Sequence, residues 1–533
     1  MNLRVTFKNL IILFGLFILG SCVSSIQQNN SLTIATSSGI AQGSLKQDVI
    51  SWEDIPYAIP PEGDLRWKAP RSLIAPELVI QRQEGNGCLQ EASIYAGIQG
   101  EGIVGQEDCL YLDIRAPVKN LNRRLPVMFW IHGGGNTSGI KDYYDFSELI
   151  RRHQVLVVTI NYRLGPMGWF THPAIQGLQN GLDKTSNFGT LDIIEALKWV
   201  QKNIQNFGGD PNNITIFGES AGGHNVLSLL ASPLSEGLFH KAISQSGYVS
   251  SYSAEYAESI SELSSKNIFA EDIKYLTDSN EIVDYLQGLT QTEVYEKYIA
   301  TAEKYVYPIT PITMRDGIVV PKEGVYKALE KADPDLIVVA GTNKDEMNYW
   351  FVNSEYFYDT SFEIRRTLKR SEANLRSWNK FRSAIWRYKG AEEPLRRMSK
   401  SNDNLYSYRL DWDEEDDGIF GDYSLFVGVF AGFFSFIPLV GIVISFFITA
   451  LLGYLQFLDT LTILYIFLIF FSAQLLESNF LTPKLVGKKL GLHPLAVLFA
   501  IFVFGALFGI IGIIFATPLM ATIVFIFKSN LKN

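Results

Sequence analysis

The stretch Ile214-Thr215-Ile216-Phe217-Gly218-Glu219-Ser220-Ala221-Gly222-Gly223 decides the fold of most of this chain. Its first four residues are apolar or β-branched, as in a buried strand, and the Gly-x-Ser-x-Gly run after them is typical of a tight strand-to-helix turn. Glycines are needed there because a Cβ on either side of the serine would collide with the strand or the helix. We therefore predict that Ser220 is a nucleophile at a helix N-terminus, where developing negative charge is favoured. The alternative is a glycine-rich loop that holds a serine by chance, and the strand and helix patterns around it argue against that.

A second glycine-rich stretch follows a run, Leu125 to Ile131, that is apolar on both faces and so suits a buried parallel strand. The run continues into His132-Gly133-Gly134-Gly135-Asn136. Consecutive glycines after a strand let bare backbone N–H groups approach a ligand oxygen, as an oxyanion hole requires. A phosphate-binding loop is the alternative, but no lysine follows at the spacing of such loops. We predict that Gly134, Gly135 and Ala221 are the oxyanion donors.

Strand and helix patterns alternate around these two stretches. Val155 to Ile160, Ala242 to Gly247 and Leu336 to Ala340 have the composition of buried strands. Glu107 to Ile114 alternates as a half-buried strand does, and Asn187 to Asn206 has the spacing of an amphipathic helix. This alternation predicts an α/β fold with a doubly wound, mostly parallel sheet.

Several motifs in the right order are similar to those of the type-B carboxylesterase and cholinesterase-like family of the α/β-hydrolase fold. The matching stretches are Gly218 to Gly222, His132 to Gly135, Glu107-Asp108-Cys109-Leu110 and Phe207-Gly208-Gly209-Asp210-Pro211. The resemblance covers about residues 34–412 and implies hydrolysis of a small-molecule ester through an acyl-enzyme. It implies no cofactor.

The chain departs from the family pattern at three positions. Asp54 stands where the family usually has glycine, and Ile193 stands where a glutamine often follows the aspartate. Asn136 stands where an aromatic or small residue often follows the glycines. Because Asn136 lies beside the predicted oxyanion hole, this last departure bears on substrate preference.

The acid member of the site is expected in the loop Gly341-Thr342-Asn343-Lys344-Asp345-Glu346, at the C-terminal end of a predicted strand. Sheets of this type place functional groups at the carboxyl ends of their strands. The resemblance gives Glu346 the role of orienting a histidine. Asp345 is the rival carboxylate, and a solvated acidic loop without a catalytic role is the other alternative.

The histidine that this mechanism needs is missing from its expected place. An imidazole has to take the serine proton, and in this fold the chain order is serine, acid, histidine. Of the six histidines only His493 follows Glu346, and it lies in a segment of a different kind. His224, on the helix after the turn, is interpreted as structural rather than as a substitute base. We therefore expect very low esterase activity.

Residues 1–22 have the pattern of a targeting segment. Arg4 and Lys8 give a positive start, and Leu10 to Leu19 is an apolar core too short to span a membrane as a mature helix. The following Leu19-Gly20-Ser21-Cys22 resembles a bacterial lipoprotein box, which implies cleavage before Cys22 and lipidation of its sulfur. A simple secretory signal with an incidental cysteine is the alternative, and both interpretations export the chain.

Cysteine usage and charge fit an exported protein. Besides Cys22 the chain has two cysteines, Cys88 and Cys109. In an oxidising compartment this pair predicts a disulfide. Two free buried thiols are the alternative. No grouping of His, Cys and Asp has the spacing of metal ligands, so no metal is expected. The net charge of −9 gives no sign of a nucleic-acid partner.

The chain changes character after Asp417, and 20 of its 35 phenylalanines follow that residue. Leu425 to Leu455, Leu458 to Leu476 and Leu495 to Phe527 are long enough and apolar enough to span a membrane. We therefore expect a signal peptide over residues 1–22, a hydrolase domain over 23–417 and an all-α transmembrane segment over 418–533. Membrane lipid is the expected partner of the last segment, and the sequence does not identify a protein partner.

The apolar segment is similar, over about residues 422–533, to the C-terminal end of the autoinducer-2 exporter permease family. The matching residues are Phe436-Ile437-Pro438-Leu439-Val440-Gly441, Gln474-Leu475-Leu476-Glu477-Ser478-Asn479, Thr482-Pro483-Lys484, Gly491-Leu492-His493-Pro494 and Gly509-Ile510-Ile511-Gly512. The N-terminal helices of that family are missing here, so the resemblance covers only part of a permease. His493 belongs to this permease-like part, which argues against its completing the triad.

The two resemblances imply topologies that conflict. Lys484, Lys488 and Lys489 favour a cytoplasmic loop, and two spans before them would place the hydrolase in the cytoplasm, although residues 1–22 export it. Both family patterns are cut short at about residues 413–422. We interpret this as a join between two fragments, either a gene fusion or an assembly artefact. A non-catalytic binding module and a membrane transport protein are the two other functional classes that remain open.

Overall fold

The structure is a computed structural model that describes residues 32–82, 85–93, 96–119, 123–302, 313–352, 354–359 and 367–411, with short pieces between Phe446 and Ile526. Contacts divide the chain into two units, Met1–Asp411 and Trp412–Asn533. The predicted signal segment with Cys22, His493 and most of the three apolar stretches lie outside the described residues. Within the part that is described, no helix combines the length and the apolar character needed to cross a membrane.

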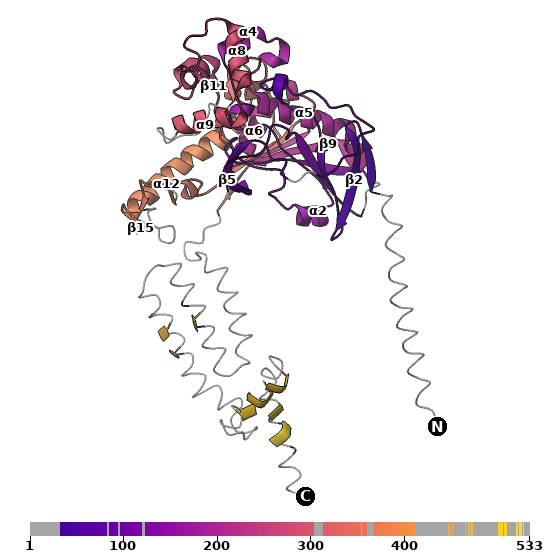
Figure 1. Cartoon of the computed structure of the whole chain (residues 1–533). Helices are drawn as coiled ribbons and strands as arrows, with labels where there is room; N and C mark the ends of the chain where they lie inside the picture. The colour runs from indigo at the N-terminus through magenta and orange to yellow at the C-terminus, as the bar shows by residue number, and fades with distance from the viewer. Residues whose placement is uncertain are drawn as a thin grey trace. The chain divides into compact units, whose positions relative to one another are not determined.

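A ten-stranded sheet forms the centre of the first unit (Figure 1). Its strands, in spatial order, are β1 (Thr33–Thr36), β2 (Gly39–Lys46), β3 (Val49–Pro56), β6 (Tyr111–Pro117), β8 (Leu156–Ile160), β7 (Leu125–Ile131), β9 (Gly209–Glu219), β10 (Lys241–Gln245), β13 (Ile337–Asn343) and β16 (Leu405–Leu410). The strands from β8 to β16 all pair in parallel, and those from β1 to β8 pair antiparallel. The prediction of a mostly parallel sheet is confirmed.

Helices cover both faces of this sheet. The helix α2 (Ser147–His153) lies on one side, and α5 (Phe188–Asn203) and α6 (Ala221–Ala231) lie on the other (Figure 1). The predicted helix from Asn187 to Asn206 is confirmed as α5 followed by one turn of 3-10 helix. Most side chains of α5 and α6 are buried, because both helices lie between the sheet and further elements. This is the doubly wound arrangement that the alternating pattern predicts.

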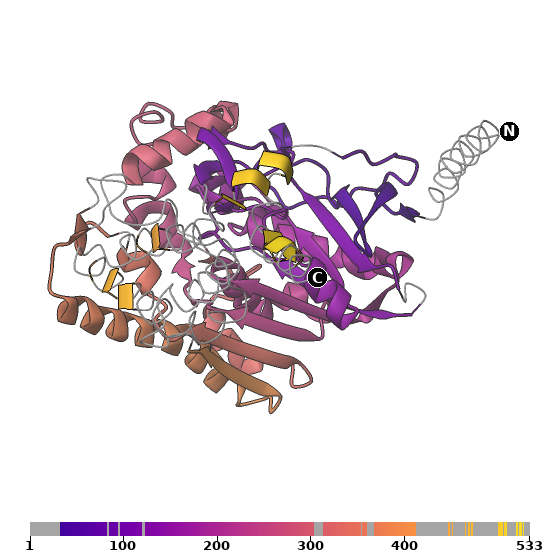
Figure 2. The same cartoon turned by 90° about the horizontal axis from the view of Figure 1, so that it is seen from below.

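The remaining elements surround these layers. The other helices are α3 (Gly165–Gly168), α4 (Pro173–Leu178), α7 (Ser265–Ile268), α8 (Ser279–Gly288), α9 (Gln291–Ala302), α10 (Val325–Ala328), α11 (Asn348–Val352), α12 (Glu372–Arg387) and α13 (Glu393–Met398). The short paired strands are β4 (Gln90–Ser93) with β5 (Ile98–Val104), β11 (Tyr252–Ser253) with β12 (Met314–Arg315), and β14 (Tyr358–Asp359) with β15 (Thr367–Leu368). Helices α4, α8 and α9 contribute to a second hydrophobic cluster, rich in aromatic residues, that also includes Phe188 of α5. Figures 1 and 2 show the first unit from two directions.

One strand differs from the sequence prediction. The alternating run from Glu107 to Ile114 was expected to form a half-buried strand, but β6 begins at Tyr111 and is buried on both faces. The reason is its place inside the sheet, between β3 and β8. Glu107 lies before the strand, where Oε1 accepts a hydrogen bond of 2.6 Å from Nε of Arg66. Both side chains of this ion pair are more than nine-tenths buried.

Candidate active site

Ser220 occupies the turn between β9 and α6 with a backbone conformation that only strong local constraints maintain. Its φ of 56° and ψ of −119° are rare for any residue other than glycine. The backbone N–H of Ser220 donates to the carbonyl of Gln245 at 2.9 Å, and its carbonyl accepts from the N–H of His224 at 2.9 Å. The turn therefore presents the serine at the carboxyl end of the sheet and at the N-terminus of α6.

The two glycines that flank Ser220 are required by close backbone contacts. A Cβ on Gly222 would lie 2.0 Å from the carbonyl oxygen of Ile131, and a Cβ on Gly218 would lie 2.6 Å from the carbonyl carbon of Gly222. No side chain fits at those distances. The steric reason given for the Gly-x-Ser-x-Gly pattern therefore holds in this structure.

The glycine loop after β7 lies directly beside the nucleophile. A Cβ built on Gly133 would lie 3.2 Å from Cβ of Ser220. Gly134 and Gly135 have left-handed φ values of 94° and 66°, which glycine tolerates without steric cost, and both are exposed. The carbonyl of Gly134 accepts from the N–H of Ser138 at 2.9 Å, which closes a tight turn. The loop thus lies beside Ser220 at Gly133, and the two glycines that follow are exposed.

Asn136 does not line the space in front of the nucleophile. Its side chain is buried, and Oδ1 accepts hydrogen bonds from Nδ2 of Asn225 at 2.8 Å and from the hydroxyl of Tyr162 at 3.2 Å. The backbone φ of 58° at Asn136 is a conformation that asparagine tolerates better than most residues. This departure from the family pattern therefore shapes the glycine loop from inside the domain.

The loop after β13 points Glu346 toward the same end of the sheet. Oε2 of Glu346 accepts from the backbone N–H of Asn343 at 2.8 Å and from the hydroxyl of Ser246 at 3.0 Å. Burial raises the pKa of Glu346, and these two hydrogen bonds oppose the increase. Asp345, the rival carboxylate, accepts instead from Nδ2 of Asn379 on α12 at 2.8 Å.

Ser246 was not recognised as a site residue from the sequence. It follows β10, the strand that lies between β9 and β13, and the rule that functional groups gather at the carboxyl ends of parallel strands would have found it. Its carbonyl also accepts from Nε1 of Trp386 on α12 at 3.0 Å. Ser246 therefore holds the Glu346 carboxylate and is itself held by a helix outside the sheet.

Glu219, the residue before the nucleophile, carries a carboxyl group that the sequence analysis did not single out. Burial, and then the negative charge of Glu346, raise the pKa of Glu219 to about 7. A Cβ on Gly133 would lie 3.2 Å from Oε2 of Glu219, so this carboxyl also borders the glycine loop. Glu219 and Glu346 thus act on each other through their charges, and within the described residues neither forms an ion pair with a cation.

No described histidine is placed to take the Ser220 proton. The ring nitrogens of His224 face the carbonyl of Tyr248 and the hydroxyl of Thr313, so this side chain points away from the turn. His132 is buried, its ring stacks on Tyr162 with centroids 4.4 Å apart, and burial lowers its pKa to about 4. The other described histidines are His153 at the end of α2, His172 at the cap of α4 and His240 before β10.

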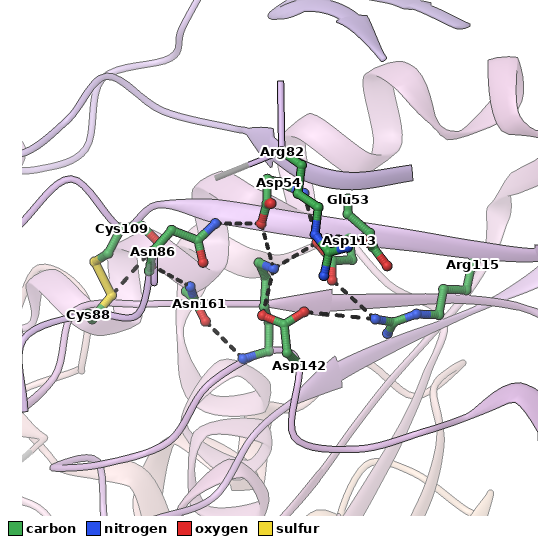
Figure 3. Close-up of polar contacts among 11 residues, drawn as sticks. Glu53, Asp54, Arg82, Asn86, Cys88, Cys109, Asp113, Arg115, Asp142 and Asn161 are labelled. Carbon is green, nitrogen blue, oxygen red and sulfur yellow. Dashed lines mark hydrogen bonds and ion pairs between the residues drawn. A yellow bond between two sulfur atoms is a disulfide. The ribbon is translucent and has the colours of Figure 1, made fainter. Parts of the chain in front are cut away.

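A buried lysine anchors the loop that continues from the glycines. Lys141 is 1% exposed, and its Nζ lies 2.8 Å from Oδ1 of Asp54, 2.9 Å from Oδ1 of Asp113 and 2.8 Å from Oδ2 of Asp142. Arg115 approaches Asp113 and Asp142 from β6 at 3.3 and 3.9 Å (Figure 3). We call these five residues the Lys141 cluster. It ties β3, β6 and the loop after the glycines together.

The charges in the Lys141 cluster are strongly coupled. Burial acts to lower the pKa of Lys141, but the charges of Asp113, Asp142 and Asp54 together raise it well above its ordinary value. Burial raises the pKa of Asp113 to about 7 against the opposing charge of Lys141. The lysine therefore stays charged, and its three carboxylate partners hold it inside the domain.

Asp54 explains one departure from the family pattern. Its φ is 58°, the left-handed region in which glycine is free of steric cost, so the family's usual glycine at this position has a clear reason. Here an aspartate takes that conformation and places its carboxylate on Lys141, and Asn86 donates a further hydrogen bond to it (Figure 3). Two residues along the chain from Asn86, Cys88 is joined to Cys109 in a disulfide.

With the fold and the site described, comparisons with known proteins define the class. The model of the carboxylesterase family matches residues 30–420, and the model of the AI-2E family transporter matches residues 420–532. The chain therefore belongs to the carboxylesterase family, and its C-terminal residues match a second family.

Individual relatives agree with this assignment. Para-nitrobenzyl esterase of Bacillus subtilis is 35% identical over 341 residues, which are 62% of this chain and 67% of that protein. Fumonisin B1 esterase of Sphingopyxis macrogoltabida is 36% identical over 62% of this chain and 59% of that protein. The chain therefore spans about three fifths to two thirds of the length of these relatives.

Solved structures support the same fold. A thermophilic PNB esterase superposes with a TM-score of 0.61 at 28% identity, covering 72% of this chain and 80% of that one. A carboxylesterase of Geobacillus stearothermophilus superposes with a TM-score of 0.58 at 27% identity, covering 72% of this chain and 80% of that one. Each of these matches confirms the α/β-hydrolase fold of the first unit.

Proposed function

We propose that the hydrolase domain of this chain is a serine carboxylic-ester hydrolase that acts on small-molecule esters through an acyl-enzyme. The observation that carries the proposal is the strained turn at Ser220, which lies against the glycine loop. In this proposal the Ser220 hydroxyl attacks the ester carbonyl, and the N–H groups of Gly134, Gly135 and Ala221 stabilise the oxyanion. The alcohol leaves, and water then hydrolyses the acyl-serine. Relatives named as esterases support this substrate class.

We propose further that this activity is impaired. Glu346 would orient a histidine that the chain lacks, because five histidines precede it and the sixth, His493, belongs to the permease-like part. Removal of one triad member from a serine hydrolase costs several orders of magnitude and leaves the rate that binding and the oxyanion hole provide. Turnover by the purified chain at the rates of ordinary esterases, typically about 1 to 10³ per second, would refute the impairment.

A fluorophosphonate probe tests whether Ser220 is activated at all. The full chain and its Ser220→Ala variant are incubated with the probe, and the labelled peptide is identified by mass spectrometry. We expect slow labelling of Ser220 in the full chain and none in the variant. No labelling of Ser220 in a folded chain would reject the hydrolase and would favour a non-catalytic binding module.

We also propose that the chain is exported and held at the membrane, either by lipid on Cys22 or by helices in residues 418–533. The match of residues 420–532 to the AI-2E family transporter supports membrane association. Metabolic labelling with a radioactive fatty acid tests the lipid anchor. Incorporation that disappears in Cys22→Ser supports it, and equal incorporation in both chains, or none in either, rejects it. Transport by the permease-like part would require flux in vesicles above that of empty ones.

A second candidate is an inactive fusion or chimeric product whose C-terminal part derives from a membrane permease. The observation that favours it is that the two family matches meet at residue 420, where one family ends and the other begins. Amplification of the source DNA across the codons for Leu410 to Phe426 tests this candidate. A continuous product means that the fusion exists in the genome. Two separate genes, with an esterase gene that continues past Trp412 to a histidine codon, would show that the join is artificial.

A further inference from the structure

Two side chains share the space on one side of Gly133. A Cβ built on Gly133 would lie 3.2 Å from Oε2 of Glu219 and also 3.2 Å from Cβ of Ser220. The carboxyl group of Glu219 and the side chain of Ser220 therefore border the same small volume in front of the glycine loop. A general base has to lie within hydrogen-bond reach of the proton it takes, directly or through one water molecule. Glu219 is a carboxyl group that borders the same atom position as the Ser220 side chain, which makes it a candidate for this role.

We propose that Glu219 is a catalytic residue of this chain and serves as the general base for Ser220 in place of an imidazole. The proposal rests on the hydrolase function proposed above, because a base has no role if Ser220 is not a nucleophile. It deepens that function by naming the group that receives the serine proton. Glu346 then acts on Glu219 through its charge, since there is no histidine between them to orient.

The reaction balances with an ester and one water molecule. The Glu219 carboxylate takes the proton of the Ser220 hydroxyl as the Oγ–C bond forms and the carbonyl electron pair moves to oxygen. When the tetrahedral intermediate collapses, the bond to the alcohol oxygen breaks, and the Glu219 carboxylic acid returns the proton to that oxygen. In the second half a water molecule gives a proton to Glu219 as its oxygen attacks the acyl carbon. The bond between Oγ of Ser220 and the acyl carbon then breaks, the carboxylic acid product leaves, and Glu219 returns the proton to Oγ of Ser220.

The electrostatics of the site suit a carboxylate base. A base works best when its pKa lies near the working pH, and burial, together with the charge of Glu346, raises the pKa of Glu219 to about 7. Other titratable groups that Glu219 acts on are the phenols of Tyr144, in the loop after the glycines, and Tyr408 on β16. Both phenols have pKa values raised by burial, so they stay neutral and bring no charge to the site at neutral pH.

Hydrolysis of p-nitrophenyl acetate by the full chain, with Ser220→Ala as the background, tests this base. We expect the Ser220-dependent rate to rise with pH through about 7 and then to level off, because only the ionised Glu219 accepts a proton. Glu219→Gln keeps the size of the side chain and removes the base. It should lower the Ser220-dependent rate at pH 8 by about 100-fold or more. A Glu219→Gln chain with the wild-type rate would overturn the proposal.

Glu346→Gln provides an independent test, because it keeps a carbonyl acceptor for Ser246 and Asn343 and removes only the charge. If Glu219 is the base, the midpoint of the pH profile moves to lower pH in this variant, because a like charge no longer raises its pKa. An unchanged midpoint would overturn the proposal. This variant decides the question even if Glu219→Gln does not fold.

The outcomes separate the two levels of inference. If the rate depends on Ser220 but not on Glu219, the proposed hydrolase function is supported and the proposed role of Glu219 as the base is rejected. If a folded chain shows no Ser220-dependent hydrolysis and no fluorophosphonate labelling, both the hydrolase function and the role of Glu219 are rejected. If the rate depends on both residues and the midpoint moves in Glu346→Gln, both are supported.

Discussion

This domain contains two groups of carboxylates, and they differ in whether a cation lies beside them. In the Lys141 cluster, three aspartates surround one fully buried lysine, and Arg115 adds a second positive charge. Near Ser220, the charge of Glu346 acts on Glu219, and within the described residues neither has a cation as partner. In the first group, positive side chains neutralise the carboxylates. In the second group, two carboxyl groups interact without a positive side chain.

The difference indicates what each group is for. A buried cation with several carboxylate partners fixes the position of the segments that carry them, since breaking such a set exposes an unpaired buried charge. Two carboxyl groups without a cation cost stability, and perturbed groups of that kind gather at functional sites. The Lys141 cluster therefore holds the loop after the glycines, and the glutamate pair is the group to which we assign a role in chemistry at Ser220.

The largest expected effect comes from removing the cation at the centre of the first group. Lys141→Met leaves the buried carboxylates of Asp54 and Asp113 without their lysine partner, and we expect a loss of about 3–5 kcal/mol in the free energy of unfolding. Urea denaturation measures this loss. Lys327→Met is the matched control, because Lys327 is exposed and paired with Glu330, and it should cost less than about 1 kcal/mol. Equal losses in the two variants would contradict the anchoring role of the cluster.

The next effect concerns Gly133, which borders both Glu219 and Ser220. In Gly133→Ala the new Cβ would lie 2.8 Å from the carbonyl oxygen of Glu219, so the glycine loop has to move away from Ser220. A shift of about 1 Å at such a site costs on the order of 100-fold, which we expect in the rate of fluorophosphonate labelling. Gly177→Ala is the control, because a Cβ there meets nothing within 4 Å. Labelling of Gly133→Ala at the wild-type rate would show that the loop does not confine the nucleophile.

A smaller effect is expected when one anion of the Lys141 cluster is neutralised. Asparagine tolerates the left-handed φ of 58° at Asp54 and keeps an acceptor for Asn86. Lys141 retains two carboxylate partners, so Asp54→Asn should cost only about 1 kcal/mol of unfolding free energy. A loss as large as that of Lys141→Met would mean that the lysine depends on Asp54 alone.

The smallest effect has the opposite sign and depends on pH. The pKa of Glu219 is raised to about 7 from an ordinary value of 4.5, so its contribution to stability is fully present below the ordinary value and is lost as pH rises through about 7. Glu219→Gln should therefore match the wild type in unfolding free energy at pH values well below 4.5. At pH 8 it should exceed the wild type by on the order of 1 kcal/mol, reduced by solvent screening. A stability difference that stays constant with pH would show that the folded chain does not raise the pKa of Glu219.

The sequence predicted the parts of the site that depend on local chain geometry. The sequence predicts the turn at Ser220 and the glycine loop after Leu125–Ile131 because each pattern depends on contacts between residues that are close in the sequence. The buried strands were readable from their uniform apolar character. The strand at Glu107 was placed four residues too early, because the ion pair of Glu107 with Arg66 joins segments far apart in the chain.

Other parts of the site depend on contacts between distant segments. The Ser246 hydroxyl donates a hydrogen bond to Glu346, although the two residues are 100 positions apart in the sequence. The Lys141 cluster joins residues from β3, β6 and a loop. Neither has a local sequence pattern. The departure at Asp54 was visible in the sequence, but its reason was not, because the left-handed backbone and the buried lysine appear only in the folded chain.

Detection of an acyl-enzyme tests the central claim, that Ser220 is a nucleophile in a chain without a triad histidine. The full chain is incubated with p-nitrophenyl acetate at pH 8, quenched in acid and digested, and the peptide that contains Ser220 is analysed by mass spectrometry. We predict one acetyl group on Ser220, and none on this peptide in Ser220→Ala. A folded chain with no acetyl group on Ser220, or with acetylation only on surface lysines, would contradict the account.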